Sequence, residues 1–158
     1  MKLPIKVEML VSKIITTPRT FIATVSAAVE LGAKPIFADI NSDSGCITAE
    51  SIESLITKKT KAIIPVHLYG QPAELKPIID LAKEYGLYVV EDAAQAVGAR
   101  YDSKEIGSHG DLVACSFYPG KNLGAYGDGA AIVTNNDELA KNCRLSAKHG
   151  RIAKYNHE

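Results

Sequence analysis

Short apolar segments alternate with amphipathic segments along most of this 158-residue chain. From position 35 to position 117, each apolar segment is long enough for a strand, and the segments between carry apolar residues at helical spacing. Strand and helix in alternation are typical of crossover units, which build a mostly parallel sheet with helices on both faces. The sequence therefore predicts an α/β fold with three layers, α/β/α.

Turn and capping residues set the expected bounds of these elements. We expect helices that end before Gly32 and Gly86, a helix capped by Thr48 and running to position 56, and a last helix that starts with a capping box of Asn135 and Glu138. A final apolar segment returns after a turn-rich loop and should be antiparallel to the strand before it. The predicted strands are 35–40, 62–66, 87–91, 112–117 and 130–134.

Composition excludes several classes of function. Eighteen basic residues balance eighteen acidic ones, so the chain has no overall field for nucleic acid or an anionic membrane. No uncharged apolar run is long enough to span a bilayer, and the first fifteen residues lack a cleavage pattern, so we expect a cytoplasmic protein. The three cysteines, Cys46, Cys115 and Cys143, lack metal-ligand spacing, and we expect neither a disulfide nor a metal site.

One lysine lies in the loop between the last two predicted strands, in the sequence SFYPGKNLGAYGDG at positions 116–129. A Walker loop would need glycine at position 115 and serine or threonine at 122, where this chain has Cys115 and Asn122. The glycines at 124, 127 and 129 do not have dinucleotide-binding spacing, and a strand follows them instead of a helix. Both nucleotide-binding interpretations therefore fail.

A lysine amine held in a partly dry pocket can form a Schiff base with an aldehyde, which points to pyridoxal phosphate. That cofactor also needs a carboxylate near its pyridinium nitrogen and donors for its phosphate. Asp92 follows the strand at 87–91, at the edge of the sheet where ligands bind in α/β folds. Ser116 precedes Lys121 by five residues. The sequence thus predicts pyridoxal phosphate bound through Lys121.

Two motifs resemble a known family: EDAAQ at 91–95 and SFYPGKNLG at 116–124. They are similar to motifs of the DegT/DnrJ/EryC1/StrS sugar aminotransferases, which are fold type I pyridoxal-phosphate enzymes. The resemblance extends through TFIAT at 20–24 and HGR at 149–151. It covers residues 15–158, which we interpret as part of the large domain, and leaves 1–14 unassigned.

The resemblance implies a role for each candidate site residue. Lys121 would hold the cofactor and move protons as general base and acid, and Asp92 would sit at the pyridinium nitrogen. Gln95 would bind near the phenolic oxygen, Ser116 would donate to the phosphate, and Phe21 would stack on the ring. Two of these residues have an alternative role: Phe21 can be a plain core aromatic residue, and Asp92 can simply cap the following turn. His67 either faces the site or is structural.

The resemblance also implies substrates and partners. The substrates are an amino acid, usually glutamate, and a keto-sugar carried on a nucleotide. The full-length enzyme is expected to be a homodimer. Family members are about twice this long or more, so an upstream phosphate-binding segment and a downstream small domain are missing. A truncated, inactive remnant is therefore a second hypothesis. Sugar dehydratases of the family have histidine in place of the lysine, so Lys121 favours transamination over dehydration.

Overall fold

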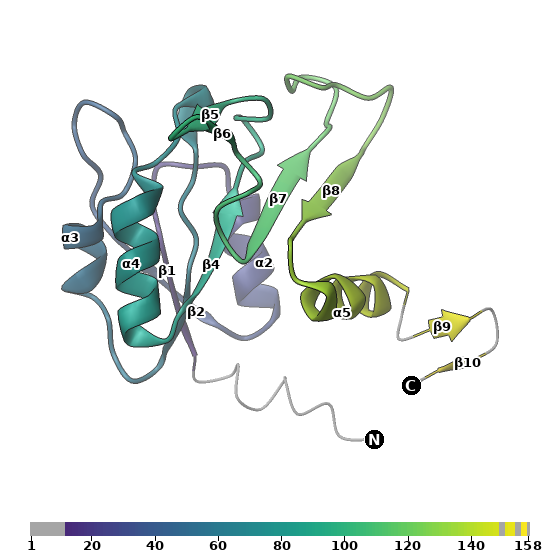
Figure 1. The fold of residues 1–158 in the computed structure, drawn as a ribbon, viewed down its shortest axis with the longest axis horizontal. Helices are drawn as coiled ribbons and strands as arrows, with labels where there is room; N and C mark the ends of the chain where they lie inside the picture. The colour runs from purple at the N-terminus through teal and green to yellow at the C-terminus, as the bar shows by residue number, and fades with distance from the viewer. Residues whose placement is uncertain (1–11, 149–150, 154–155, 158) are drawn as a thin grey trace.

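The computed structural model describes residues 12–148, 151–153 and 156–157, and Figure 1 shows its arrangement. Six strands form one sheet in the order β2-β1-β3-β4-β7-β8. The first five strands in this order run parallel, and β8 pairs antiparallel with β7. The predicted mostly parallel sheet with one antiparallel return strand is confirmed. The strands are β1 (Lys13–Thr16), β2 (Lys34–Phe37), β3 (Thr60–Ile63), β4 (Tyr88–Asp92), β7 (Leu112–Ser116) and β8 (Ala130–Val133).

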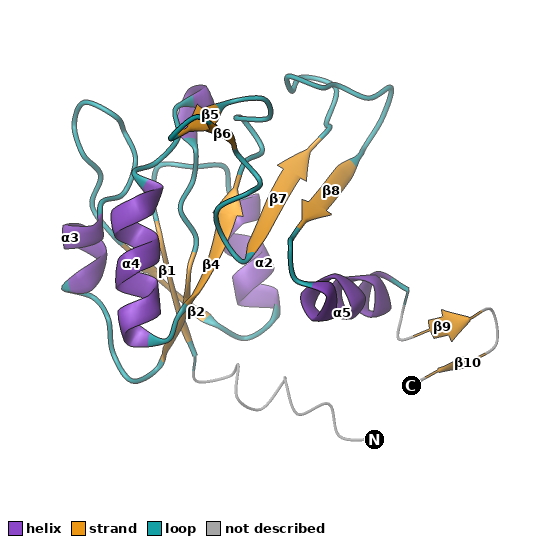
Figure 2. Cartoon of the chain, in the orientation of Figure 1, coloured by secondary structure: helices purple, strands orange, loops and turns teal. Residues whose placement is uncertain are grey.

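Helices and a small hairpin connect these strands, and a last helix and a second small hairpin follow β8 (Figure 2). A 3₁₀ turn, Leu68–Gly70, follows β3 and precedes the longest helix of the core. The helices are α2 (Ala23–Glu30), α3 (Ala49–Glu53), α4 (Leu75–Tyr85) and α5 (Asp137–Ala147). The hairpins are β5 (Arg100–Tyr101) with β6 (Lys104–Glu105), and β9 (Arg151–Ala153) with β10 (Asn156–His157).

Two adjacent residues of β1 show that helices cover both faces of the sheet. Ile15 packs in a cluster with Ile52 of α3 and Ile78 of α4, whereas Ile14 packs with Ala28 of α2. Since successive side chains of a strand point to opposite faces, α3 and α4 lie on one face and α2 on the other. The three-layer prediction is therefore confirmed for this part of the sheet.

Helix ends follow the capping chemistry, with one correction. Gly86 ends α4 in the left-handed region at φ 65°, and Thr48 begins α3 with a capping box that it forms with Ser51. The predicted cap of α5 at Asn135 is wrong by one residue. Asn136 is the N-cap, and its side chain accepts from the amides of the second and third helical residues, as an N-cap should.

Three predicted bounds also shift, for local reasons. β3 ends before Pro65, which has no N–H for the sheet. β2 begins at Lys34 and ends at Phe37, and Ile40 only forms an isolated bridge with Ile47. α3 ends at Glu53 because the following turn tightens into i→i+3 bonds.

Some expectations concern residues that the structure does not describe, namely residues 1–11 of the unassigned segment and residues 149–150 of the HGR motif. Within the described ranges, none of the helices has the length and hydrophobicity that crossing a bilayer requires.

The two edges of the sheet differ in how they are protected. β2 has the sequence KPIF, and both lysine and proline on an edge strand discourage pairing with another chain. β8 has the sequence AAIV, with neither proline nor charge. Ile132 of β8 is 58% exposed and Val133 is 40% exposed, and the neighbouring α5 buries none of its residues. We therefore predict that edge-to-edge association of this chain occurs at β8.

We expect Ile132→Lys to reduce self-association of the 158-residue chain, because a charged side chain on an edge strand opposes pairing with a second copy. Sedimentation velocity at several concentrations measures the effect. Leu31→Lys is the matched control, since Leu31 is similarly exposed at 55% but is the C-cap of α2, which packs on β1, and three strands separate β1 from β8. Equal self-association of the two variants would contradict the assignment of the β8 edge.

Candidate active site

The candidate site lies where parallel strands β4 and β7 end. Asp92 is the last residue of β4 and pairs with Ala114 of β7, two residues before that strand ends at Ser116. Carboxyl ends of parallel strands meet at one edge of a sheet, where α/β proteins bind ligands. The loops that carry Gln95 and Lys121 leave the sheet at this same edge (Figure 1).

A cavity of about 820 Å³ opens at this edge. All five residues predicted for the site line it: Lys121, Asp92, Gln95, Ser116 and Phe21. The fold thus brings together these five residues from three separate segments of the chain, around positions 21, 92–95 and 116–121. The other lining residues are Thr20, Ala23, Thr24, Val66, Ala94, Tyr118, Asp128, Gly129 and Ala130.

The loop of Lys121 is held at its base by main-chain hydrogen bonds. The Phe117 amide donates to the Gly129 carbonyl at 2.7 Å, and the Lys121 amide donates to the Tyr118 carbonyl at 2.8 Å. A Cβ atom at Gly124 would lie 2.3 Å from the Pro119 carbonyl oxygen, so the loop can close this tightly only with glycine there. Lys121 itself is half-buried against the cavity.

Asp92 uses both carboxylate oxygens as acceptors. Oδ1 accepts from the Ala94 amide at 3.0 Å, and Oδ2 accepts from the Thr24 hydroxyl at 2.6 Å. The first bond caps the turn that follows β4, and the second comes from α2 across the cavity wall. Asp92 therefore caps a turn and also presents a carboxylate to the cavity.

Thr24 is a site residue that the sequence analysis missed. Its hydroxyl lies 3.0 Å from that of Thr20, one helical turn earlier, and donates to Asp92. Four-residue spacing of two threonines at the start of a helix is the sequence signal. Only the tertiary structure shows that this helix faces the end of β4.

Gln95 is oriented by a main-chain donor. The Tyr69 amide donates to Oε1 of Gln95 at 2.9 Å, which leaves the side-chain NH₂ group of Gln95 as a donor. Tyr69 is one of the few described non-glycine residues with positive φ, at 55°. Such backbone strain is often found beside functional groups.

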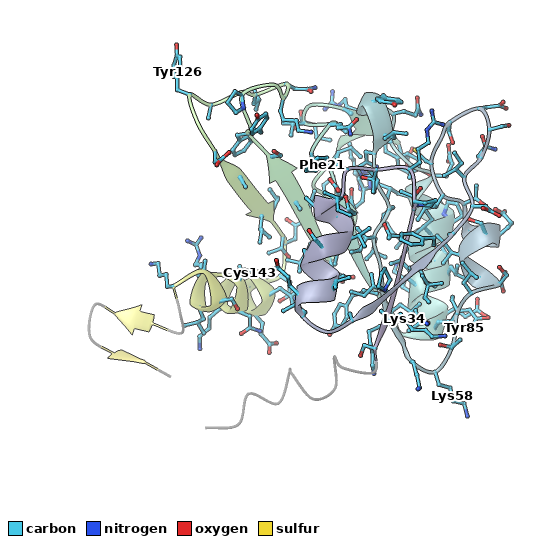
Figure 3. All side chains as sticks on the ribbon, turned by 180° about the vertical axis from the view of Figure 1, so that it is seen from behind. Phe21, Lys34, Lys58, Tyr85, Tyr126 and Cys143 are labelled. Atoms are coloured by element: carbon cyan, nitrogen blue, oxygen red, sulfur yellow. The ribbon has the colours of Figure 1, made fainter. Side chains whose placement is uncertain are left out.

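The remaining predicted residues lie on the cavity rim. Ser116 Oγ accepts from the Tyr118 amide at 3.3 Å, so its hydroxyl proton can be donated to a ligand. Phe21 precedes α2 and is 68% exposed, which argues against the alternative of a core aromatic. Figure 3 shows Phe21 beside the N-terminal end of α2, and Tyr126 far out on the β7–β8 loop.

His67 does not face the cavity. It is fully buried, and its ring bonds to Glu91 instead. Burial, together with the charges of Glu91 and Asp92, raises the pKa of the Cys115 thiol, which makes it a poor nucleophile at neutral pH. Among the residues that the structure describes, no cluster of three or more potential metal ligands occurs.

The donor set fits pyridoxal phosphate. The cavity is lined by the amine of Lys121, the carboxylate of Asp92 and the amide donor of Gln95. The hydroxyl of Ser116 and the exposed aromatic ring of Phe21 also line it. These are the groups that an aldehyde, a pyridinium nitrogen, a phenolic oxygen, a phosphate and a ring face require.

Known proteins have similar sequences and structures. The chain is 52% identical over 145 residues to a pleiotropic regulatory protein of Geobacillus stearothermophilus, covering 92% of this chain and 39% of that protein. It is 46% identical over 146 residues to the UDP-N-acetyl-3-dehydro-alpha-D-glucosamine 3-aminotransferase of Acidithiobacillus ferrooxidans, covering 92% and 40% respectively. The chain therefore spans about two fifths of the length of these relatives.

Among solved structures, ntda of Bacillus subtilis with bound cofactor PMP aligns with a TM-score of 0.87 at 37% identity. The alignment covers 98% of this chain and 36% of that one. PMP is the amine form of the cofactor expected from the sequence, and this similarity supports both that cofactor and the fold type I assignment. The sequence profile of the DegT/DnrJ/EryC1/StrS aminotransferase family matches residues 5–158. The chain belongs to the DegT/DnrJ/EryC1/StrS aminotransferase family and forms part of its cofactor-binding large domain.

Proposed function

We propose that the complete gene product is a pyridoxal-phosphate-dependent aminotransferase. It moves an amino group from an amino acid, glutamate by family resemblance, to a keto-sugar carried on a nucleotide. One observation carries this proposal: a lysine amine and a strand-end carboxylate, Lys121 and Asp92, line the same cavity. The nucleotide-sugar relative described above supports the substrate class.

The five predicted site residues and Thr24 each have a task in this reaction. Bound pyridoxal phosphate supplies an electron-poor ring that stabilises negative charge on the substrate carbon. Lys121 holds the cofactor and moves the proton at that carbon. The Asp92 carboxylate keeps the ring nitrogen protonated, and Thr24 holds that carboxylate in place through its 2.6 Å bond. Gln95 and Ser116 donate to cofactor oxygens, and Phe21 covers the ring face.

Two features of the family also enter the proposal. The complete protein is a homodimer, and the exposed aromatic residues Tyr118 and Tyr126 of the β7–β8 loop suit coverage by a second subunit. The presence of Lys121, where the dehydratases of the family have histidine, supports transamination.

An inactive remnant stays as the second candidate, because the unprotected β8 edge suits a chain that needs further segments to complete its sheet. Sequencing the DNA on both sides of the reading frame separates the two candidates. A continuing frame supports the enzyme, and stop codons on both sides support the remnant.

Lys121 should be the residue that borohydride labels with the cofactor. We expect the complete protein to be yellow, peptide mapping after reduction to place the pyridoxyl group on Lys121, and Lys121→Ala to abolish transamination. Lys104→Ala is the control, because Lys104 lies exposed in the β5–β6 hairpin. A label on any other lysine would remove Lys121 from its assigned role.

Asp92→Asn should preserve the fold but reduce kcat by roughly 100-fold or more, since an amide cannot supply the charge that keeps the ring nitrogen protonated. An asparagine keeps the Oδ1 acceptor for the Ala94 amide, so the turn cap survives. Thermal unfolding and steady-state kinetics check both parts. Unchanged turnover together with unchanged stability would instead assign Asp92 a capping role alone, because asparagine caps the turn as well as aspartate does.

The 158-residue chain alone should bind pyridoxal phosphate at least about tenfold more weakly than the complete protein, because phosphate affinity comes largely from amides at a helix N-terminus. By resemblance, that helix lies outside this sequence. Absorbance titration of both proteins measures the difference, with Lys121→Ala of the same chain as the control for non-specific reaction of other lysines. Micromolar binding and turnover by the short chain would contradict this expectation.

A further inference from the structure

His67 is a buried titratable residue that the proposed chemistry does not use. It follows Val66, which forms an isolated bridge with Asp92, and it is 0% exposed. A polar ring in the core costs free energy unless its nitrogens are hydrogen-bonded. Both of them are.

The hydrogen bonds of His67 define its tautomer. The Ala73 amide donates to Nδ1 at 3.1 Å. An N–H group needs an acceptor, so Nδ1 carries no proton. The ring proton therefore lies on Nε2, which donates to Oε2 of Glu91 at 2.9 Å. The neutral His67 ring thus accepts a hydrogen bond from a main-chain amide on one side and donates one to a carboxylate on the other.

Glu91 is held from its other side as well. It is 0% exposed, and its Oε1 accepts from the Gly110 amide, which precedes β7. A Cβ atom at position 110 would lie 2.9 Å from this oxygen and 2.9 Å from the Val89 carbonyl, so a side chain there would force the two segments apart. Both carboxylate oxygens of Glu91 are thus fixed, by groups from the two neighbouring segments.

The link to the site is that Glu91 and Asp92 are consecutive residues of β4. Their side chains leave opposite faces of the strand, so rotation of the strand end about its axis moves both. His67 also contacts the strand directly, because its amide donates to the Asp92 carbonyl at 3.0 Å. One residue therefore holds the end of β4 at two points, through its ring and through its backbone.

We propose that His67 is a positioning residue, which fixes the direction of the Asp92 carboxylate in the cavity through its neutral Nε2–H bond to Glu91. This inference rests on the proposed function for the task of Asp92. The hydrogen-bonded geometry of the His67 ring does not depend on that function.

Two substitutions in the complete protein separate the two bonds of the ring. His67→Gln can place an NH₂ donor near the position of Nε2 and keep the bond to Glu91. His67→Asn can place an oxygen near Nδ1 and keep the bond from Ala73, but it is too short to reach Glu91. Ile52→Val is the control for lost stability, because it removes a buried methyl group from α3 without touching this network.

We expect His67→Asn to lower kcat by on the order of 10- to 100-fold with KM for both substrates nearly unchanged, since a displaced carboxylate affects the reacting centre. The pyridoxal phosphate dissociation constant should rise, and the pH midpoint of the bound cofactor's absorption should shift. His67→Gln should stay within about threefold of the unsubstituted protein in kcat. Ile52→Val should lower only the unfolding temperature.

Nitrogen NMR of the unsubstituted protein, labelled with ¹⁵N-histidine, tests the tautomer without cofactor or activity. We expect one ring with an unprotonated Nδ1 and a protonated Nε2, and His67→Gln should remove that signal. A protonated Nδ1 would overturn the proposal. So would a folded His67→Gln variant whose kcat falls by about tenfold or more, and this outcome can be measured even if His67→Asn does not fold.

The proposed function and the positioning role fail in different ways. If the unsubstituted complete protein binds the cofactor but transaminates no nucleotide keto-sugar, the proposed function is wrong. In that case the tautomer, the cofactor dissociation constants and the absorption midpoints of the variants still support or overturn the role of His67.

Discussion

The main-chain hydrogen bonds around Asp92 are the constraint on which the whole site depends. The Asp92 amide donates to the Pro65 carbonyl, its carbonyl accepts from the His67 amide, and the Ala93 amide donates to the Ala114 carbonyl. The end of β4 is therefore tied to both neighbouring segments. A slip of one residue would turn Asp92 into the core and Glu91 toward the cavity, because strand side chains alternate between faces.

The two carboxylates at the end of β4 illustrate how environment assigns roles to similar side chains. Glu91 is fully buried, with donors from His67 and Gly110 on its two oxygens. Asp92 is half-buried, and Thr24 and the following turn donate to it at the cavity wall. An anion in the core must be fully hydrogen-bonded, whereas an anion at a cavity can keep lone pairs for a ligand. Glu91 is thus suited to holding the end of β4 in place, and Asp92 is suited to contacting a ligand in the cavity.

The packing is uneven across the sheet, and this affects the lysine. The main core cluster lies under β1, β3 and β4 and includes residues of α3 and α4. The lysine loop connects β7 to β8, the outermost strand, where α5 buries no residue. The position of Lys121 is therefore fixed at the β7 end of its loop. At the β8 end, its position depends on the segment that covers the β8 edge. Asp92 has no such dependence, because β4 lies inside the sheet.

The sequence by itself determined the fold class and predicted five of the residues that line the cavity. Alternating apolar and amphipathic segments specified a parallel sheet, because strand and helix periods differ, and residues at strand ends such as Asp92 and Ser116 were placed by topology alone. The cap of α5 at Asn136 and the length of α3 were decided by local hydrogen bonds, whereas β3 ends before Pro65 because proline has no N–H for the sheet. Only the tertiary structure decided that Thr24 meets Asp92 and that His67 turns away from the cavity to Glu91. These contacts join residues 68 and 24 positions apart, and no local pattern can encode a partner that only the packing of separate segments brings within hydrogen-bond distance.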